Sequence, residues 1–170
     1  MKHFKNYILP ISLILILSFS RIIPHPWNFT PILATGIFSG FYFKKFYLSS
    51  LIVLLPMFLG DLYLGFHNTM FFTYISLAAA VGFGLLIKQF KILEIFLSGI
   101  LSSVCFFIIT NFGAWITLEM YEKNLEGLIN SYVMAIPFFQ NSLISTFLYL
   151  FGIKIFYELI INKKKISLNA

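Results

Sequence analysis

The sequence predicts an all-α bundle of about six transmembrane helices, forming a single integral membrane domain over residues 1–170. Of the 170 residues, 59% are hydrophobic and only 11% are charged. A water-soluble domain of this length could not bury that much apolar surface. A helix needs about 20 apolar residues to cross a bilayer, so several crossings use up the chain and leave no room for a separate soluble domain.

Six apolar runs, separated by breaks that carry charge, proline or glycine, define the predicted spans. These are 7–23, 32–43, 46–60, 70–87, 92–112 and 138–161. We interpret the first run as a retained span, because the residues after it lack the small-residue cleavage pattern of a signal peptide. The second and third runs are short enough for a re-entrant hairpin. A hairpin would leave Lys44 and Lys45 at membrane depth, so two crossings are favoured.

Lysine placement predicts the orientation of these spans. With six crossings, one side of the membrane holds Lys2, Lys5, Lys44, Lys45, Lys88, Lys91, Lys163, Lys164 and Lys165. The other side holds only Arg21 and Lys123 as cations, so the positive-inside rule predicts that both termini are cytoplasmic. The predicted location is a bacterial inner membrane. The net charge of +6 does not indicate a nucleic-acid partner, because the lysines fall in short clusters between apolar runs.

The connection between the first two spans is the strongest candidate for binding a ligand on the external side. Prolines at 24, 26 and 31 stiffen it, which lowers the ordering cost of gripping a ligand. We therefore select His25, Trp27, Asn28 and Thr30 as substrate-binding candidates. The alternative is an interfacial loop whose tryptophan lies in the aromatic belt of the membrane surface.

The end of the third predicted span adds Asp61 and His67 to the substrate-binding candidates. A carboxylate at membrane depth is costly and usually functional. Its simpler role is to cap the next helix or to pair with Arg21. His25 and His67 share the external side, but two histidines without a third ligand are weak support for zinc. No metal or other cofactor is predicted.

The last external candidates follow the fifth span and begin the sixth. They are Asn111, Trp115, Gln140 and Asn141, which offer amide groups and a stacking surface to a ligand. Alternatively, the asparagine at 111 satisfies carbonyls of its own helix and the tryptophan anchors the interface. Between these spans, residues 119–131 carry apolar side chains at near-helical spacing, which predicts an external amphipathic helix on the membrane surface.

Small residues mark one face of the second span. Ala34, Gly36 and Gly40 would allow another helix to approach closely. Such faces usually serve packing within a bundle; the more specific hypothesis is docking of a partner membrane subunit.

Four motifs together resemble a family of small, uncharacterised bacterial membrane proteins that is similar to the substrate-binding S components of energy-coupling factor transporters. They are Pro24-His25-Pro26-Trp27-Asn28-Phe29-Thr30-Pro31, Asp61-Leu62-Tyr63-Leu64-Gly65, Thr110-Asn111-Phe112-Gly113-Ala114-Trp115 and Ala135-Ile136-Pro137-Phe138-Phe139-Gln140-Asn141. The resemblance implies capture of a vitamin or other micronutrient at the external face, with a transmembrane coupling subunit and two cytoplasmic ATPases as partners. The small-residue pattern that contacts the coupling subunit lies on the first helix in that family, and here on the second span. The sequence has no Walker motif, so any ATP use belongs to another subunit.

The leading functional hypothesis is therefore a substrate-binding subunit of a micronutrient transporter, with the bilayer and a small solute as partners. A rival is a non-transporting accessory or assembly protein that binds another membrane subunit. A third class, an intramembrane enzyme, would require His25, His67 and Asp61 to converge. The sequence offers no nucleophile–base pair, phosphate-binding glycine loop or carboxylate pair, so we do not expect an enzyme.

Overall fold

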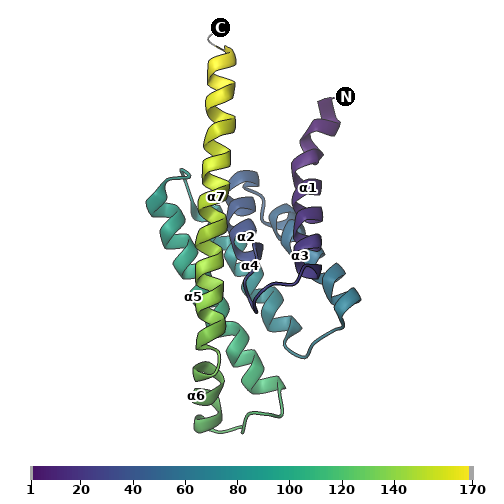
Figure 1. Cartoon of the computed structure of the whole chain (residues 1–170), viewed down its shortest axis with the longest axis vertical. Coiled ribbons are helices and arrows are strands. Elements are labelled where there is room, and N and C mark those ends of the chain that lie inside the picture. Colours follow the sequence, from purple (N-terminus) through teal and green to yellow (C-terminus); the bar gives the residue numbers. More distant parts are fainter. Residues whose placement is uncertain (1, 169–170) are drawn as a thin grey trace.

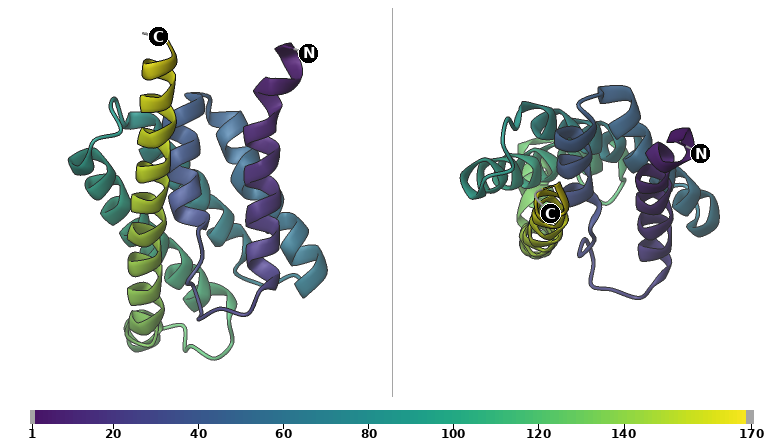
Figure 2. Two further views of the ribbon diagram at one scale, coloured as in Figure 1. Left: turned by 45° about the horizontal axis from the view of Figure 1, so that its top comes forward. Right: turned by 90° about the horizontal axis from the view of Figure 1, so that it is seen from above.

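The computed structural model describes residues 2–168, and the side chains of residues 8–159. This part of the chain is all-helical and contains no strand, which confirms the all-α class that the sequence predicted. Its seven helices are α1 (Lys2–Ile22), α2 (Ile32–Phe43), α3 (Phe46–Leu64), α4 (Met70–Leu86), α5 (Ile92–Thr117), α6 (Leu125–Val133) and α7 (Ile136–Leu168). The free ends of α1 and α7 lie at one end of the bundle and α6 lies at the other (Figures 1 and 2).

Three of the described helices are long and apolar enough to cross a membrane. They are α3, α5 and the part of α7 from Ile136 to Leu159. Three shorter apolar helices, Ile8–Ile22, Ile32–Phe43 and Met70–Leu86, correspond to the other predicted spans. With 12 residues, α2 is only about 18 Å long and would not cross a hydrocarbon core of about 30 Å by itself.

The third helix is longer than the predicted span 46–60. It runs to Leu64, and Gly65 ends it with a φ of 103°, a left-handed conformation that glycine adopts without strain. The backbone N–H of Gly65 closes the helix by donating to the carbonyl of Asp61. Asp61 thus lies inside α3, and the 19-residue helix is about 28 Å long. The prediction that this acidic residue closes the span was wrong by one turn.

The boundaries of two other helices, α5 and α6, also differ from those predicted from the sequence. The fifth helix continues to Thr117, past the predicted end at 112, so both Asn111 and Trp115 are helical. The surface helix was predicted over 119–131 and is found at Leu125–Val133. Its start is fixed by Asn124, whose side chain accepts a hydrogen bond of 2.8 Å from the backbone N–H of Gly127.

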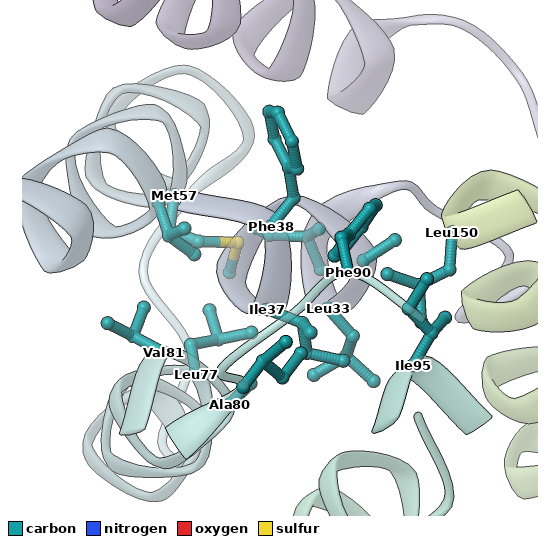
Figure 3. Packing of buried hydrophobic residues seen from close by; sticks show 14 residues of the cluster. Leu33, Ile37, Phe38, Met57, Leu77, Ala80, Val81, Phe90, Ile95 and Leu150 are labelled. Carbon is teal, nitrogen blue, oxygen red and sulfur yellow. The ribbon is translucent and has the colours of Figure 1, made fainter. Parts of the chain in front are cut away.

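The short helix α2 forms the centre of the bundle. It packs against α3, α4, α5 and α7, and every residue from Ile32 to Gly40 is buried. Figure 3 shows Leu33, Ile37 and Phe38 projecting from α2 among side chains of the surrounding helices. The core cluster is Ile32, Leu33, Ala34, Ile37, Phe38, Val53, Met57, Leu77, Ala80, Val81, Ile87, Phe90, Ile95 and Leu150. This position fits the even distribution of apolar residues around α2, because no face of the helix meets solvent along most of its length.

The small-residue face of α2 contacts α4 of the same chain. A Cβ added to Gly36 would lie 3.5 Å from the Cβ of Ala80, and one added to Gly40 would lie 2.9 Å from the backbone nitrogen of Leu85. Ala34, the third docking candidate, is fully buried. The structure thus uses this face for helix packing inside the bundle.

Polar contacts join the helices at the end of the bundle where the free ends of α1 and α7 lie. Ser39 and Ser49 exchange hydrogen bonds between side chain and backbone, which ties α2 to α3. The ammonium group of Lys44 donates to the carbonyls of Leu85 and Ile87 where α4 ends. A lysine near a helix C-terminus satisfies carbonyls that have no partner within the helix.

Candidate functional site

A cavity of about 790 Å³ opens among the described helices, toward the end of the bundle opposite the free ends of α1 and α7. Its wall comes from the end of α1, the connection to α2, the first turn of α2, parts of α3, the first half of α4, the second half of α5 and the start of α7. The polar residues along it are Ser20, Arg21, His25, Asn28, Thr30, His67, Thr69, Thr73, Thr110, Asn111, Ser142 and Ser145. Apolar groups supply most of the remaining surface, as is typical of small-molecule sites.

The connection of residues 23–31 forms one side of the cavity and folds back on itself. The backbone N–H of Phe29 donates to the carbonyl of Pro26 over 3.0 Å, and Asn28 has a φ of 60°. Asparagine tolerates this left-handed conformation better than other residues with a Cβ. Two side chains of α7 reach the same turn: Asn141 donates to the carbonyl of Trp27 at 3.0 Å, and Ser145 to the carbonyl of Asn28 at 3.4 Å. The connection is therefore anchored to α7 by side-chain bonds to its backbone.

We expect Asn141→Ala to loosen residues 23–31 while leaving the helices intact. The substitution removes the shorter of the two anchoring hydrogen bonds, which is worth about 1 kcal/mol. Hydrogen exchange should then be about fivefold faster at Phe29, whose N–H closes the turn. Gln140→Ala is the matched control, because the neighbouring Gln140 is exposed and does not line the cavity. Equal exchange in both variants would show that Asn141 does not hold the connection.

A buried ion pair joins α1 to α3 beside the cavity. Nη2 of Arg21 donates to Oδ1 of Asp61 at 2.6 Å, and the hydroxyl of Tyr74 donates to Oδ2 at 2.7 Å. Nε2 of His67 lies 3.8 Å from the same Oδ2. Asp61 is only 1% exposed, whereas Arg21 is 19% exposed and lines the cavity. The arginine thus lies between the cavity and the carboxylate.

The guanidinium is held against α3 at a glycine. A Cβ added to Gly60 would lie 2.6 Å from Cδ of Arg21, closer than real side chains approach, so a larger residue would displace the arginine. Nη1 of Arg21 also lies 2.7 Å from the sulfur of Met57. These contacts fix the arginine in one position, and its Nε has no hydrogen-bond partner among the described residues.

Six of the ten substrate-binding candidates line the cavity. They are His25, Trp27, Asn28, Thr30, His67 and Asn111. Of these, Asn111 uses its amide nitrogen to donate to the carbonyl of Phe107 in its own helix. Trp27 is 79% exposed, so its ring stands at the edge of the cavity rather than inside it.

The other four candidates lie outside the wall. Asp61 is behind Arg21, Asn141 anchors the connection, and Gln140 is exposed. Trp115 donates through its indole nitrogen to the carbonyl of Glu122, and Lys123 donates to the carbonyl of Trp115 in return. This exchange closes the connection between α5 and α6.

Sequence reasoning missed several hydroxyls of the wall. Thr69 and Thr73 are four residues apart at the start of α4, and Ser142 and Ser145 are three apart on α7. Such spacing places each pair on one helix face, so a helical projection of the two spans would have grouped them. Ser142 and Thr110 also bond carbonyls of their own helices, the usual arrangement for these residue types in apolar helices.

The enzyme hypothesis requires His25, His67 and Asp61 to lie together. The described structure does not group all three. Among the described residues, no group of three His, Cys, Asp or Glu side chains could hold a metal ion. His67 lies near Asp61 and is hydrogen-bonded to the hydroxyl of Thr69 at 2.8 Å. His25 instead donates through Nδ1 to the carbonyl of Ile23 at 2.6 Å.

Comparison with known proteins gives one relationship. No curated protein and no solved structure matches the chain significantly. A family model, described as a family of unknown function (DUF6580), matches residues 1–168. That match covers almost all of the 170 residues, so the chain belongs to the DUF6580 family.

Proposed function

We propose that the chain is the solute-binding membrane subunit of a transporter for a vitamin-like micronutrient. The observation that carries this proposal is the cavity of about 790 Å³, which six helices and a proline-rich connection enclose at one end of the bundle. Its volume falls in the range of about 300–1,000 Å³ that is usual for small-molecule sites. A wall of apolar groups with hydroxyls, amides and imidazoles is suited to a solute that carries several polar groups.

In this proposal the chain crosses a bacterial inner membrane six times, with the short α2 buried among the other spans, and α6 lies on the outer surface of the membrane. Both termini are cytoplasmic and the cavity opens to the outside. The lysines of the α2–α3 and α4–α5 connections support this orientation, because positive residues gather in cytoplasmic loops. The apolar side chains Leu125, Ile129 and Val133 of α6 are exposed, as expected for a helix that rests on lipid.

Cysteine labelling tests the orientation. Cys105 is the only cysteine, so Cys105→Ser gives a background free of thiols. In this background we expect Met120→Cys, in the α5–α6 connection, to react with a membrane-impermeant maleimide in right-side-out vesicles. Lys45→Cys, in the α2–α3 connection, should react only after the membrane is opened. The reverse pattern would place the cavity on the cytoplasmic side.

Thermal unfolding of the purified chain tests solute binding directly. We expect at least one member of a panel of vitamins and nucleobases to raise the midpoint, because a ligand at 100 times its Kd adds about 2.7 kcal/mol of stability. Thr110→Val should reduce that shift, because Thr110 lines the cavity and the substitution removes its hydroxyl. Thr117→Val is the matched control: it lies on the same helix, bonds its own backbone in the same way, and does not line the cavity. The absence of any shift would contradict the proposal.

A transmembrane coupling subunit and cytoplasmic ATPases would supply the energy in this scheme. The rival function, an accessory protein that binds another membrane subunit, draws less support. The small-residue face proposed for docking, at Gly36 and Gly40, is covered by α4. Copurification separates the two: ATPase subunits would support transport, whereas a different membrane complex with no solute-dependent stabilisation would favour the accessory role.

A further inference from the structure

We infer that the cavity takes a solute with a carboxylate or an equivalent single negative charge, which binds at Arg21. This inference rests on the proposed solute-binding function and specifies the chemical class of its ligand. It follows from three features of the described residues: the unused donors of the guanidinium, the charges that face the cavity, and the direction of two helices at its wall.

The first feature is the hydrogen-bonding capacity of Arg21. A guanidinium has five N–H donors. Asp61 takes one of them and the sulfur of Met57, a weak acceptor, takes another. The Nε–H is buried against Gly60 and is not open to a solute, which leaves one N–H on each of the two terminal nitrogens. The arginine lines the cavity and is 19% exposed. An anionic group in the cavity would therefore find a cation that is already fixed in place and still has donors to offer.

The second feature is that the counter-charge of Arg21 is hidden. Both oxygens of Asp61 are hydrogen-bonded, to the guanidinium and to Tyr74, and the side chain is 1% exposed. No Asp or Glu is among the described residues of the wall, whereas His25 and His67 both line it. A bound solute thus meets the positive side of the ion pair and two imidazoles, and no carboxylate of the described wall.

The third feature is the direction of α2 and α4. Both helices begin at the cavity, where Thr30 and Ile32 mark the start of α2 and Thr69 and Thr73 the start of α4. A helix N-terminus carries partial positive charge, which favours a nearby anion. The ends of α1, α3 and α5, at Ile22, Leu64 and Leu118, also reach the wall and carry partial negative charge, so the helix ends offset one another in part. The full charge of Arg21 therefore decides the sign, and a cationic solute would meet it with no carboxylate among the described residues of the wall to offset it.

The test compares acids with uncharged analogues of nearly the same shape. The full-length chain in nanodiscs of phosphatidylcholine would be unfolded thermally with nicotinate or nicotinamide, indole-3-acetate or indole-3-acetamide, and pantothenate or panthenol. Thiamine and choline serve as cations. For the pairs that bind, we expect the acid to bind about tenfold or more tightly than its neutral analogue, since hydrogen bonds to charged groups are stronger than neutral ones.

Two variants assign the preference to Arg21. Arg21→Gln combined with Asp61→Asn removes both charges of the pair and keeps polar groups at both positions, so this double variant should lose the preference for acids. Lys123→Gln is the matched control, because it removes a cation from the same end of the bundle that is not part of the wall. The comparison within the parent protein stands even if the double variant does not fold.

The outcomes separate the inference from the function on which it rests. A preference for acids that disappears in the double variant supports the inference. Equal or tighter binding of the neutral or cationic compounds would overturn it and leave solute binding intact, as would a preference that survives the double substitution. If no compound changes the unfolding midpoint, the solute-binding function fails and the inference fails with it.

Discussion

Arg21→Ala is expected to destabilise the folded chain by about 3 kcal/mol or more. The substitution removes the guanidinium from a carboxylate that is 1% exposed in the parent structure, and leaves Tyr74 as the one remaining hydrogen-bond donor of Asp61 within 3 Å. An uncompensated charge in a low-dielectric interior is far more costly than the loss of an ordinary contact. The free energy of unfolding of the purified protein, measured in detergent with increasing denaturant, gives the size of the effect.

Two controls separate the buried charge from general damage to α1. Arg21→Gln with Asp61→Asn removes both charges, so we expect it to cost much less than Arg21→Ala alone. Glu158→Gln breaks the ion pair of Lys154 and Glu158 on α7, whose carboxylate is 56% exposed, and should change stability by less than about 1 kcal/mol. If the double variant were as unstable as the single one, the loss would come from packing at Gly60 and Met57 rather than from charge.

The same ion pair explains where sequence reasoning about the third helix failed. An aspartate within an apolar run marks a span boundary when its partner is unknown, because an unpaired carboxylate would be placed in water. Its partner Arg21 is 40 positions earlier in the chain and reaches it only after α1 packs on α3. Pairing of Asp61 with Arg21 was considered from the sequence. The sequence could not show that this pairing allows α3 to continue to Leu64, because that depends on tertiary contacts. The helices themselves were predictable, because a long apolar run has few alternatives to forming a helix.

The candidate site was predictable in part for a related reason. Residues 25–30 differ from the apolar runs around them, so their proline and polar composition pointed to the cavity. The hydroxyls at Thr73, Ser142 and Ser145 are inside apolar helices, where serine and threonine also serve helix packing or bond their own backbone. Only the arrangement of the helices shows which of these hydroxyls face the cavity. Trp115 shows the opposite error. Its indole was predicted to bind a ligand, but it donates a hydrogen bond to the carbonyl of Glu122 in the α5–α6 connection.

Gly84→Ala is expected to have an effect as large as that of Arg21→Ala, for a steric reason. A Cβ at this position of α4 would lie 2.8 Å from the carbonyl carbon of Ile37 and 2.9 Å from its Cα. Both atoms belong to the backbone of α2, which is buried at the centre of the bundle and cannot move aside as a flexible side chain would. We expect a loss of about 3 kcal/mol or more in the free energy of unfolding, at the upper end for overpacked sites.

The matched control for Gly84 lies two residues away on the same helix. Among the described residues, no heavy atom outside the immediate helix lies within 4 Å of a Cβ added to Gly82, so Gly82→Ala should remain within about 1 kcal/mol of the parent. Gly40→Ala approaches the same contact from α2, where its Cβ would lie 2.9 Å from the backbone nitrogen of Leu85, and should be about as harmful as Gly84→Ala. The first turn of α2 forms part of the cavity wall. A forced separation of α2 from α4 should therefore also weaken solute binding in any variant that still folds. Equal stability of Gly82→Ala and Gly84→Ala would show that α2 and α4 do not pack this closely.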